Sequence, residues 1–298
     1  MDKPLDVILH MEREDWDRNA AFYRRDERSP LMRAQAAKRE SFYRIQRGQR
    51  VLDLGCGAGG TVSKLRARGV EAVGIDFSPA MIEAARSEHG LKNYVTCAEA
   101  TELPFESDSF DVVIADGVLH HLAVQGRLNE ALREVHRVLR PGGKLCCFDR
   151  NGTLASYLLL RMAIGIKELI RFATRGDRYA GSATRNEIPF GTRKDLETLR
   201  RCGFKLVRRR DVASAPFFMS VVMLNTVQYF LSERLRRSLE PKVCRLLAWV
   251  EAHCTWRRLS VEALAVFEAK PCAAYADRAA AHANPEPVAT IAMLATTM

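Results

Sequence analysis

The chain of 298 residues is long enough to bury a substantial core, and this length favours one domain with insertions over two full domains. Lysine and arginine exceed aspartate and glutamate by 10, so the surface should attract anions such as nucleic acid, anionic lipid or acidic substrates. The 8 cysteines include no C-x-x-C pair, which argues against a zinc site and for a reducing cytoplasm. The first residues lack the apolar core of a signal peptide, so we expect a cytoplasmic protein.

Residues 1–48 are charged and show a helical pattern with interleaved aromatic side chains. Such a segment cannot form a core alone. We therefore expect one to three helices that pack as a cap over the domain that follows.

Residues 51–60 combine a strand-forming run with a cluster of glycines, and a helical pattern follows in residues 61–68. Glycine suits a tight turn with positive φ, and the first N–H groups of a helix can bind a ligand. The spacing G-x-G-x-x-G in residues 55–60 also fits a dinucleotide site, so the turn alone does not identify the ligand. Asp53 favours a positively charged ligand, because its carboxylate would repel a pyrophosphate.

Strand and helix patterns then alternate over the core segment, residues 49–150. A second strand ends at Asp76, whose carboxylate is placed to accept hydrogen bonds from ribose hydroxyls. Ser78 and Pro79 are typical of the helix start that follows. Further segments are a strand at 93–97, a strand at 110–115, an amphipathic helix over 128–139 that ends at Pro141-Gly142-Gly143, and a strand at 144–149. This alternation predicts an α/β fold with a parallel sheet, helices on both faces, and ligands at the carboxyl ends of the strands.

The chain becomes less regular after the fifth strand. A last core helix and strand are predicted within residues 192–211, and a final strand at 262–270. Two apolar insertions, 151–191 and 212–261, should form a substrate-binding cap. The apolar run in the second is too short to cross a bilayer, so it should either be buried or lie in the membrane interface between arginines. Residues 271–298 are predicted to be a disordered tail.

The glycine turn, the strand ending at Asp76 and the segments 98–105, 110–114 and 137–143 together resemble the class I S-adenosylmethionine (SAM) dependent methyltransferases. The resemblance is to the branch that includes quinone and other small-molecule enzymes, and it covers about residues 45–150 and the final strand. It implies a doubly wound, seven-stranded Rossmann-like sheet and SAM as the cofactor. The implied reaction is methyl transfer to oxygen or carbon of an apolar or amphiphilic small molecule of the natural product, quinone or lipid type.

The resemblance also implies which residues bind SAM. They are Asp53, Gly55, Cys56, Gly57, Asp76, Phe77, Glu99, Ala100, Asp116 and Leu119. Asp53 and the turn would hold the methionine end, and Asp76 the ribose. Glu99 with Ala100 would border the adenine, although the family often has Asp at the first of these positions. Asp116 and Leu119 would line the other side of the cofactor.

His120 and His121 follow the fourth strand, at the edge where the methyl group would be presented. Histidine is suited to remove a proton near neutral pH, so one of the two is a candidate base. The alternative is a structural role, because Leu-His-His is common in the family whatever the acceptor. Weaker candidates are Asp149, Arg150, Tyr179 and Glu187.

The N-terminal region often closes over the cofactor in the family, which makes Trp16 and Tyr23 possible contacts. Packing of these two aromatic side chains against the sheet is the favoured alternative.

Two other functions stay open, a NAD-dependent oxidoreductase on a Rossmann fold and a non-catalytic, nucleic-acid-binding relative. We expect no metal, because no spaced cluster of carboxylates and histidines is present. We expect no nucleic acid as a substrate, since the chain lacks an Asn/Asp-Pro-Pro-Tyr motif. An anionic membrane surface is a candidate partner, which would place the protein at the inner face of the membrane.

Overall fold

The computed structural model describes residues 4–26, 30–150, 191–214 and 260–270, together with single helical residues between 158 and 165 and between 235 and 249. Most of the predicted cap insertions and all of the predicted tail, residues 271–298, lie outside the described residues.

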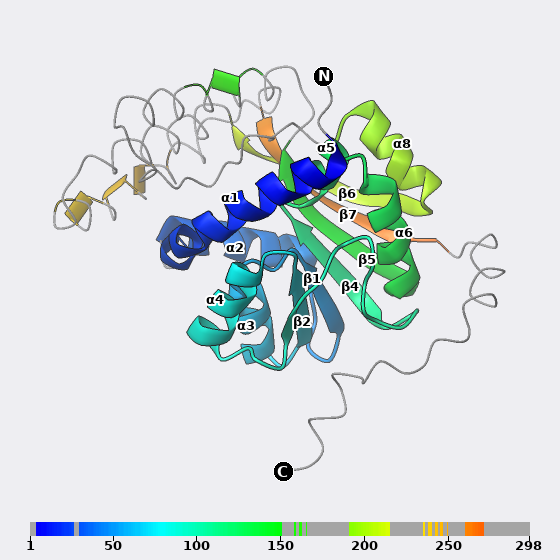
Figure 1. Ribbon diagram of the computed structural model, residues 1–298, viewed down its shortest axis with the longest axis horizontal. Coiled ribbons are helices and arrows are strands. Elements are labelled where there is room, and N and C mark those ends of the chain that lie inside the picture. The colour runs from blue at the N-terminus through cyan, green and yellow to red at the C-terminus, as the bar shows by residue number, and fades with distance from the viewer. Residues whose placement is uncertain are drawn as a thin grey trace, which may run out of the picture.

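Seven strands form one sheet in the order β3-β2-β1-β4-β5-β7-β6. The strands are β1 (Arg50–Leu54), β2 (Glu71–Asp76), β3 (Val95–Cys97), β4 (Phe110–Asp116), β5 (Leu139–Arg150), β6 (Phe204–Ser214) and β7 (Ser260–Ala269). The described helices include α1 (Leu5–Asp26), α2 (Pro30–Tyr43), α3 (Gly60–Ala67), α4 (Pro79–His89), α5 (Leu119–Val124), α6 (Leu128–Val138) and α8 (Arg193–Arg201) (Figure 1). The predicted α/β fold is confirmed, with one change. Strand β7 runs antiparallel to both of its neighbours, so the sheet is mixed.

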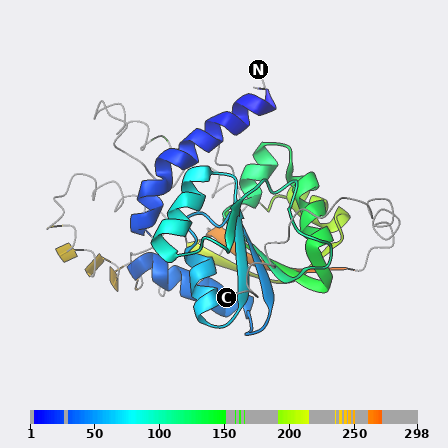
Figure 2. The same ribbon diagram turned by 60° about the horizontal axis from the view of Figure 1, so that its bottom comes forward.

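Helices cover both faces of the sheet because successive strand residues point to opposite sides. Leu52 and Leu54 of β1 reach the core under α5, α6 and α8, whereas Val51 reaches the core under α2, α3 and α4. Figures 1 and 2 show these two layers of helices around the twisted sheet. All three side chains are almost completely buried. The sheet is therefore a rigid support for whatever lies at its edges.

Helix α6 ends at Val138, earlier than the predicted helix end at Pro141-Gly142-Gly143. Leu139 is already extended and pairs with Phe110 of β4. The residue before a proline is disfavoured in a helix, and Arg140 holds that position. Leu139 is buried in the core all the same, so its apolar spacing reflected burial rather than helix.

Arg137 near the end of α6 holds the loop that precedes β4. Its guanidinium donates to the carbonyl oxygens of Phe105 (2.7 Å) and Leu103 (3.0 Å) and pairs with Glu134 at 2.7 Å. Burial alone would raise the pKa of Glu134, but the hydrogen bonds from Arg137 and from the N–H of Leu103 hold that pKa below its usual value. One charged pair thus fixes two of the segments that carried the family resemblance.

Replacing Arg137 with Met should lower the free energy of unfolding by about 1–3 kcal/mol, because two part-buried carbonyl oxygens and Glu134 lose a charged donor. Urea unfolding measures the change. The control is Arg200→Met on α8, where the side chain is 81% exposed. This control should stay within about 0.5 kcal/mol of the parent protein. Equal effects of the two substitutions would contradict the role assigned to Arg137.

Candidate active site

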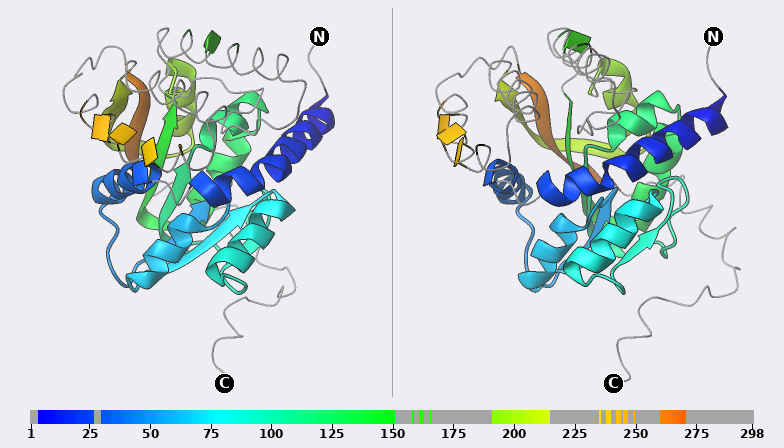
Figure 3. Two further views of the ribbon diagram at one scale, coloured as in Figure 1. Left: turned by 90° about the vertical axis from the view of Figure 1, so that its left-hand side faces the viewer. Right: turned by 60° about the vertical axis from the view of Figure 1, so that its left-hand side comes forward.

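The carboxyl ends of β1, β2, β4 and β5 meet at one edge of the sheet, and α1 crosses this edge. Side chains of α1 contact α4, α5 and the segment after β3. Figures 2 and 3 show α1 lying across the ends of these elements. Within residues 1–48, for which a helical cap is predicted, the structure describes the helices α1 and α2.

The turn after β1 has a backbone that requires glycine. Gly55 has φ 70° and Gly57 has φ 52°, values that other residues rarely adopt. A Cβ added at Gly55 would lie 2.5 Å from Cγ2 of Val118, whereas one at Gly57 would meet no atom within 4 Å. The turn is thus packed on the side of Gly55 and open at Gly57. A ligand can approach the backbone there.

Asp76, at the end of β2, is hydrogen-bonded to this turn. Its Oδ2 accepts the N–H of Gly57 and its Oδ1 accepts the N–H of Ser78, both at 2.9 Å. Burial raises the pKa of Asp76 to about 6, although the N–H groups of Ser78, Gly57 and Phe77 oppose the shift. Each carboxylate oxygen can accept a further hydrogen bond. The position therefore fits the hydroxyl groups of a ribose.

The other acidic residue of the turn, Asp53 on β1, is also buried, as is the side chain of Cys56. Two buried carboxylates beside an open glycine turn favour a cationic ligand over a pyrophosphate. The residues present thus fit SAM, whose sulfonium group is positively charged.

Helix α1 covers the segments predicted to contact the nucleoside. Asp17 accepts a hydrogen bond from the Ser78 hydroxyl at the start of α4. The Arg13 guanidinium lies 3.7 Å from the Glu99 carboxylate and 5.9 Å from the centre of the Phe77 ring. Glu99 also pairs with Arg127 at 2.6 Å. The carboxylate of Glu99 is therefore held by cations from two helical elements.

Each of the two histidines has a carboxylate neighbour. Nδ1 of His120 lies 2.7 Å from Oδ1 of Asp149, whose Oδ2 accepts the backbone N–H of His120 at 3.2 Å. Nδ1 of His121 lies 3.8 Å from Glu12 of α1. All four residues are buried. A carboxylate at Nδ1 favours the proton on that nitrogen, which leaves Nε2 of His120 as the basic nitrogen.

The rings of His120 and His121 lie 4.0 Å apart between their centres. Trp16 of α1 packs edge-on against His121 at 5.4 Å. Trp16 therefore contacts a candidate site residue. The side chain of Tyr23 lies outside the described part of the structure.

Asp116 at the end of β4 is bound to α2. It pairs with Arg39 at 3.0 Å and accepts a hydrogen bond from the Tyr43 hydroxyl. Burial raises the pKa of Asp116, and Arg39 and Tyr43 act in the opposite direction. Arg39 also lies 4.9 Å above the centre of the Phe148 ring. These contacts hold α2 at the carboxyl edge of the sheet.

The structure does not bring all predicted cofactor residues to the surface of the site. Leu119 is fully buried in the hydrophobic core. Ala100 is partly buried and packs against the same core. The contacts from α1 and α2 were not predicted from the sequence, because single polar residues in charged helices give no local signal. They involve Glu12, Arg13, Asp17, Arg39 and Tyr43.

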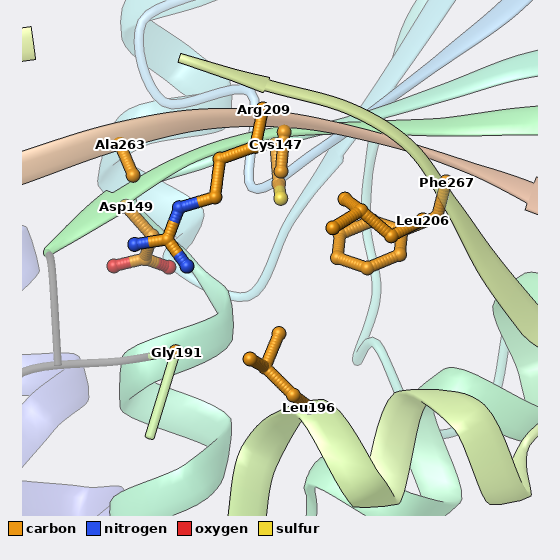
Figure 4. Close-up of a pocket in the computed structure, with 9 residues that line it drawn as sticks. Cys147, Asp149, Gly191, Leu196, Leu206, Arg209, Ala263 and Phe267 are labelled. Atoms are coloured by element: carbon orange, nitrogen blue, oxygen red, sulfur yellow. The ribbon is translucent and has the colours of Figure 1, made fainter. Parts of the chain in front are cut away.

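A mostly apolar pocket lies beside Asp149, the carboxylate neighbour of His120. It is formed by β5, β6, β7 and the start of α8, and Leu196, Leu206 and Phe267 contribute to its lining. Figure 4 shows the Arg209 guanidinium and the Asp149 carboxylate facing each other at one end of it. An apolar surface therefore continues from the carboxylate that contacts His120.

Within the described residues, no group of three or more His, Cys, Asp and Glu side chains could hold a metal ion. No helix in that same part of the chain combines the length and apolarity needed to cross a bilayer.

Comparisons with known proteins identify a methyltransferase domain in the chain. Residues 52–147 match the family described as methyltransferase domain. A demethylmenaquinone methyltransferase of Clavibacter sepedonicus is 40% identical over 100 residues, which are 33% of this chain and 40% of the relative. The 24-methylenesterol C-methyltransferase 2 of Arabidopsis thaliana is 28% identical over 178 residues, 58% of this chain and 46% of the relative. The chain spans less than half the length of these two curated relatives.

The crystal structure of the [4+2]-cyclase SpnF has a TM-score of 0.52 with 22% identity, and the match covers 80% of each chain. This likeness shows the fold alone. Residues 52–147 therefore form a methyltransferase domain of the class I, SAM-dependent type, and SAM is the cofactor of this domain.

Asp76→Ala should weaken SAM binding by about 10- to 100-fold, because a charged acceptor of ribose hydrogen bonds is lost. Calorimetric titration with SAM measures the affinity. The matched control is Glu71→Ala at the exposed start of the same strand, which should leave the affinity unchanged. Equal affinities of the Asp76 variant and the parent protein would place the ribose elsewhere.

SAM affinity should also fall as the pH drops through about 6, the pKa of Asp76. The ionised carboxylate is the better acceptor, and at pH 5 only about a tenth of it would remain, which predicts roughly tenfold weaker binding. Titrations at a series of pH values test this, and Asp76→Asn should flatten the profile.

The free energy of unfolding should depend on pH in the opposite direction. The raised carboxyl pKa of Asp76 stabilises the folded state below about pH 4, and this contribution is lost as pH rises through about 6.

Proposed function

We propose that the protein transfers the methyl group of SAM to oxygen or carbon of an apolar or amphiphilic small molecule, of the natural product, quinone or lipid type. The observation that carries this proposal is the His120–Asp149 pair at 2.7 Å, with an apolar pocket beside it. The two relatives support the proposal, because their names give demethylmenaquinone and a methylenesterol as substrates. The apolar insertions of the sequence agree with such an acceptor.

The proposed cofactor contacts follow from the geometry of the site. Asp53 and the backbone of the Gly55–Gly57 turn would hold the methionine end, and Asp76 the ribose. Phe77 and Glu99, both beneath Arg13 of α1, would border the adenine side. SAM supplies an electrophilic methyl group on its sulfonium.

Methyl transfer mainly requires that donor and acceptor are held in contact and that water is excluded. Helix α1 is suited to exclude water, since Trp16 and the buried Glu12 lie over His121. We assign His121 to holding this helix in place.

The proposed base is Nε2 of His120. As the acceptor atom bonds to the methyl group it must lose a proton, and His120 would take that proton. Asp149 would then stabilise the imidazolium through Nδ1 and keep the ring in one orientation. Asp149 is therefore a positioning residue, because it acts on the acceptor through His120.

Two observations bear on the other functions. Asp53 would face the pyrophosphate of NAD, which disfavours an oxidoreductase. The [4+2]-cyclase with the same fold is named for a different reaction, so binding of SAM by itself does not establish methyl transfer. A direct transfer assay is needed.

The test is incubation of the protein with methyl-labelled SAM and a cell extract of its host, followed by partition of the label. Label in the organic fraction, in a compound of low molecular mass, is the expected result. Label in nucleic acid or protein would contradict the proposed acceptor class. No label in any fraction, with SAM bound tightly, would contradict the transferase activity.

Replacing His120 with Gln should lower kcat by about 10²- to 10⁴-fold, the usual contribution of a general base, while SAM affinity stays unchanged. Asp149→Asn should lower kcat and shift the pH profile of kcat to lower pH, because the imidazolium loses its carboxylate. Both are measured with the labelled compound from the extract. The control is His89→Gln on the exposed end of α4. A pH profile unchanged by Asp149→Asn would contradict the base assignment.

A further inference from the structure

Two sets of helical residues in the insertions expose large apolar side chains. In the first set, Leu158 is 58% exposed and Met162 is 47% exposed. In the second set, Leu235, Leu246 and Trp249 are 46%, 59% and 57% exposed. Large apolar side chains that gather on a protein surface mark an interaction site more often than single ones do.

The spacing of these residues is helical. The described helical residues 158, 161, 162 and 165 follow the pattern i, i+3, i+4, i+7, and the described helical residues 235, 238, 239, 242, 246 and 249 have the same kind of spacing. Residues with this spacing share one side of a helix. In Figures 1 and 3 the short coloured pieces of both sets lie on the outside of the molecule. Each set therefore presents one exposed helical side.

The same exposed sides carry cations. Arg161 lies between Leu158 and Met162, and Lys242 and Arg245 precede Leu246. Among the described residues of the two sets there is no Asp or Glu.

The surrounding sequence has the same bias. Residues 151–190 and 215–259 contain 13 Lys and Arg but 6 Asp and Glu, so they account for +7 of the net charge of +10 in fewer than a third of the residues. The positive charge of the chain is therefore concentrated around the exposed apolar side chains.

We propose that these residues form a surface that binds an anionic lipid bilayer at its interface, without crossing it. We call it the insertion surface and define it by Leu158, Arg161, Met162, Leu235, Lys242, Arg245, Leu246 and Trp249. Apolar side chains and a tryptophan can enter the headgroup region, while the cations pair with anionic lipids. Nucleic acid would use the cations but would leave Leu and Met exposed to water, so the bilayer explains both features.

The test is flotation of the full chain with vesicles of phosphatidylcholine, with or without phosphatidylglycerol. Binding should require phosphatidylglycerol and weaken as salt is added. Lys242→Gln with Arg245→Gln should weaken binding roughly 30-fold, since each cation near the surface contributes about 1 kcal/mol. Leu246→Ser with Trp249→Ser should weaken it by at least about tenfold.

The matched control is Arg200→Gln with Arg201→Gln on α8, where the two side chains are 81% and 77% exposed. It removes the same charge and should change binding less than about threefold. Unchanged SAM affinity verifies that each variant is folded. Because the assay contains neither SAM nor an acceptor, its outcome is independent of the proposed methyl transfer.

Several results would overturn the proposal. They are equal binding to vesicles with and without phosphatidylglycerol, no binding to either, and equal losses in the Lys242/Arg245 variant and the α8 control. Retention of vesicle binding by these variants, together with loss of RNA binding, would assign the surface to nucleic acid instead. A concentration-dependent dimer that is abolished by Leu246→Ser with Trp249→Ser, without vesicle binding, would assign it to a second copy of the chain.

Discussion

The contact between Asp76 and the N–H of Gly57 is the constraint on which the site depends. It joins the end of β2 to the turn after β1, so that a buried carboxylate and an open stretch of backbone face the same space. Burial raises the pKa of the Asp76 carboxyl, so its ionised form is less stable in the folded protein than in water. A group held at this cost at a sheet edge is better explained by a ligand than by the stability of the fold.

Arginines from the segments that cover the carboxyl edge of the sheet pair with acidic residues at that edge. Arg39 of α2 meets Asp116, and Arg13 of α1 with Arg127 meets Glu99. The acidic groups at the carboxyl ends of the strands thus serve two purposes. Some hold the covering helices, and Asp76 holds the glycine turn and is the proposed acceptor of ribose hydrogen bonds.

The histidine pair shows how position separates two residues of the same type. His120 has its closest carboxylate on a core strand, whereas His121 faces Glu12 and Trp16 on the covering helix. A base has to stay in one orientation while the covering helix admits a ligand. This difference in partners, rather than any difference in residue chemistry, supports the choice of His120.

The sequence by itself determined the glycine turn, the acid at the end of β2, the alternation of strands and helices and the family resemblance, because these features rest on local backbone geometry and short spacings. It did not determine the end of α6, since Leu139 continues the helical spacing of apolar residues but is buried in an extended conformation. The partners of Asp116, Glu99 and the two histidines were decided only by the tertiary structure. Glu12 lies more than a hundred residues from His121 in the sequence, and no local pattern encodes which distant side chains a fold brings into contact.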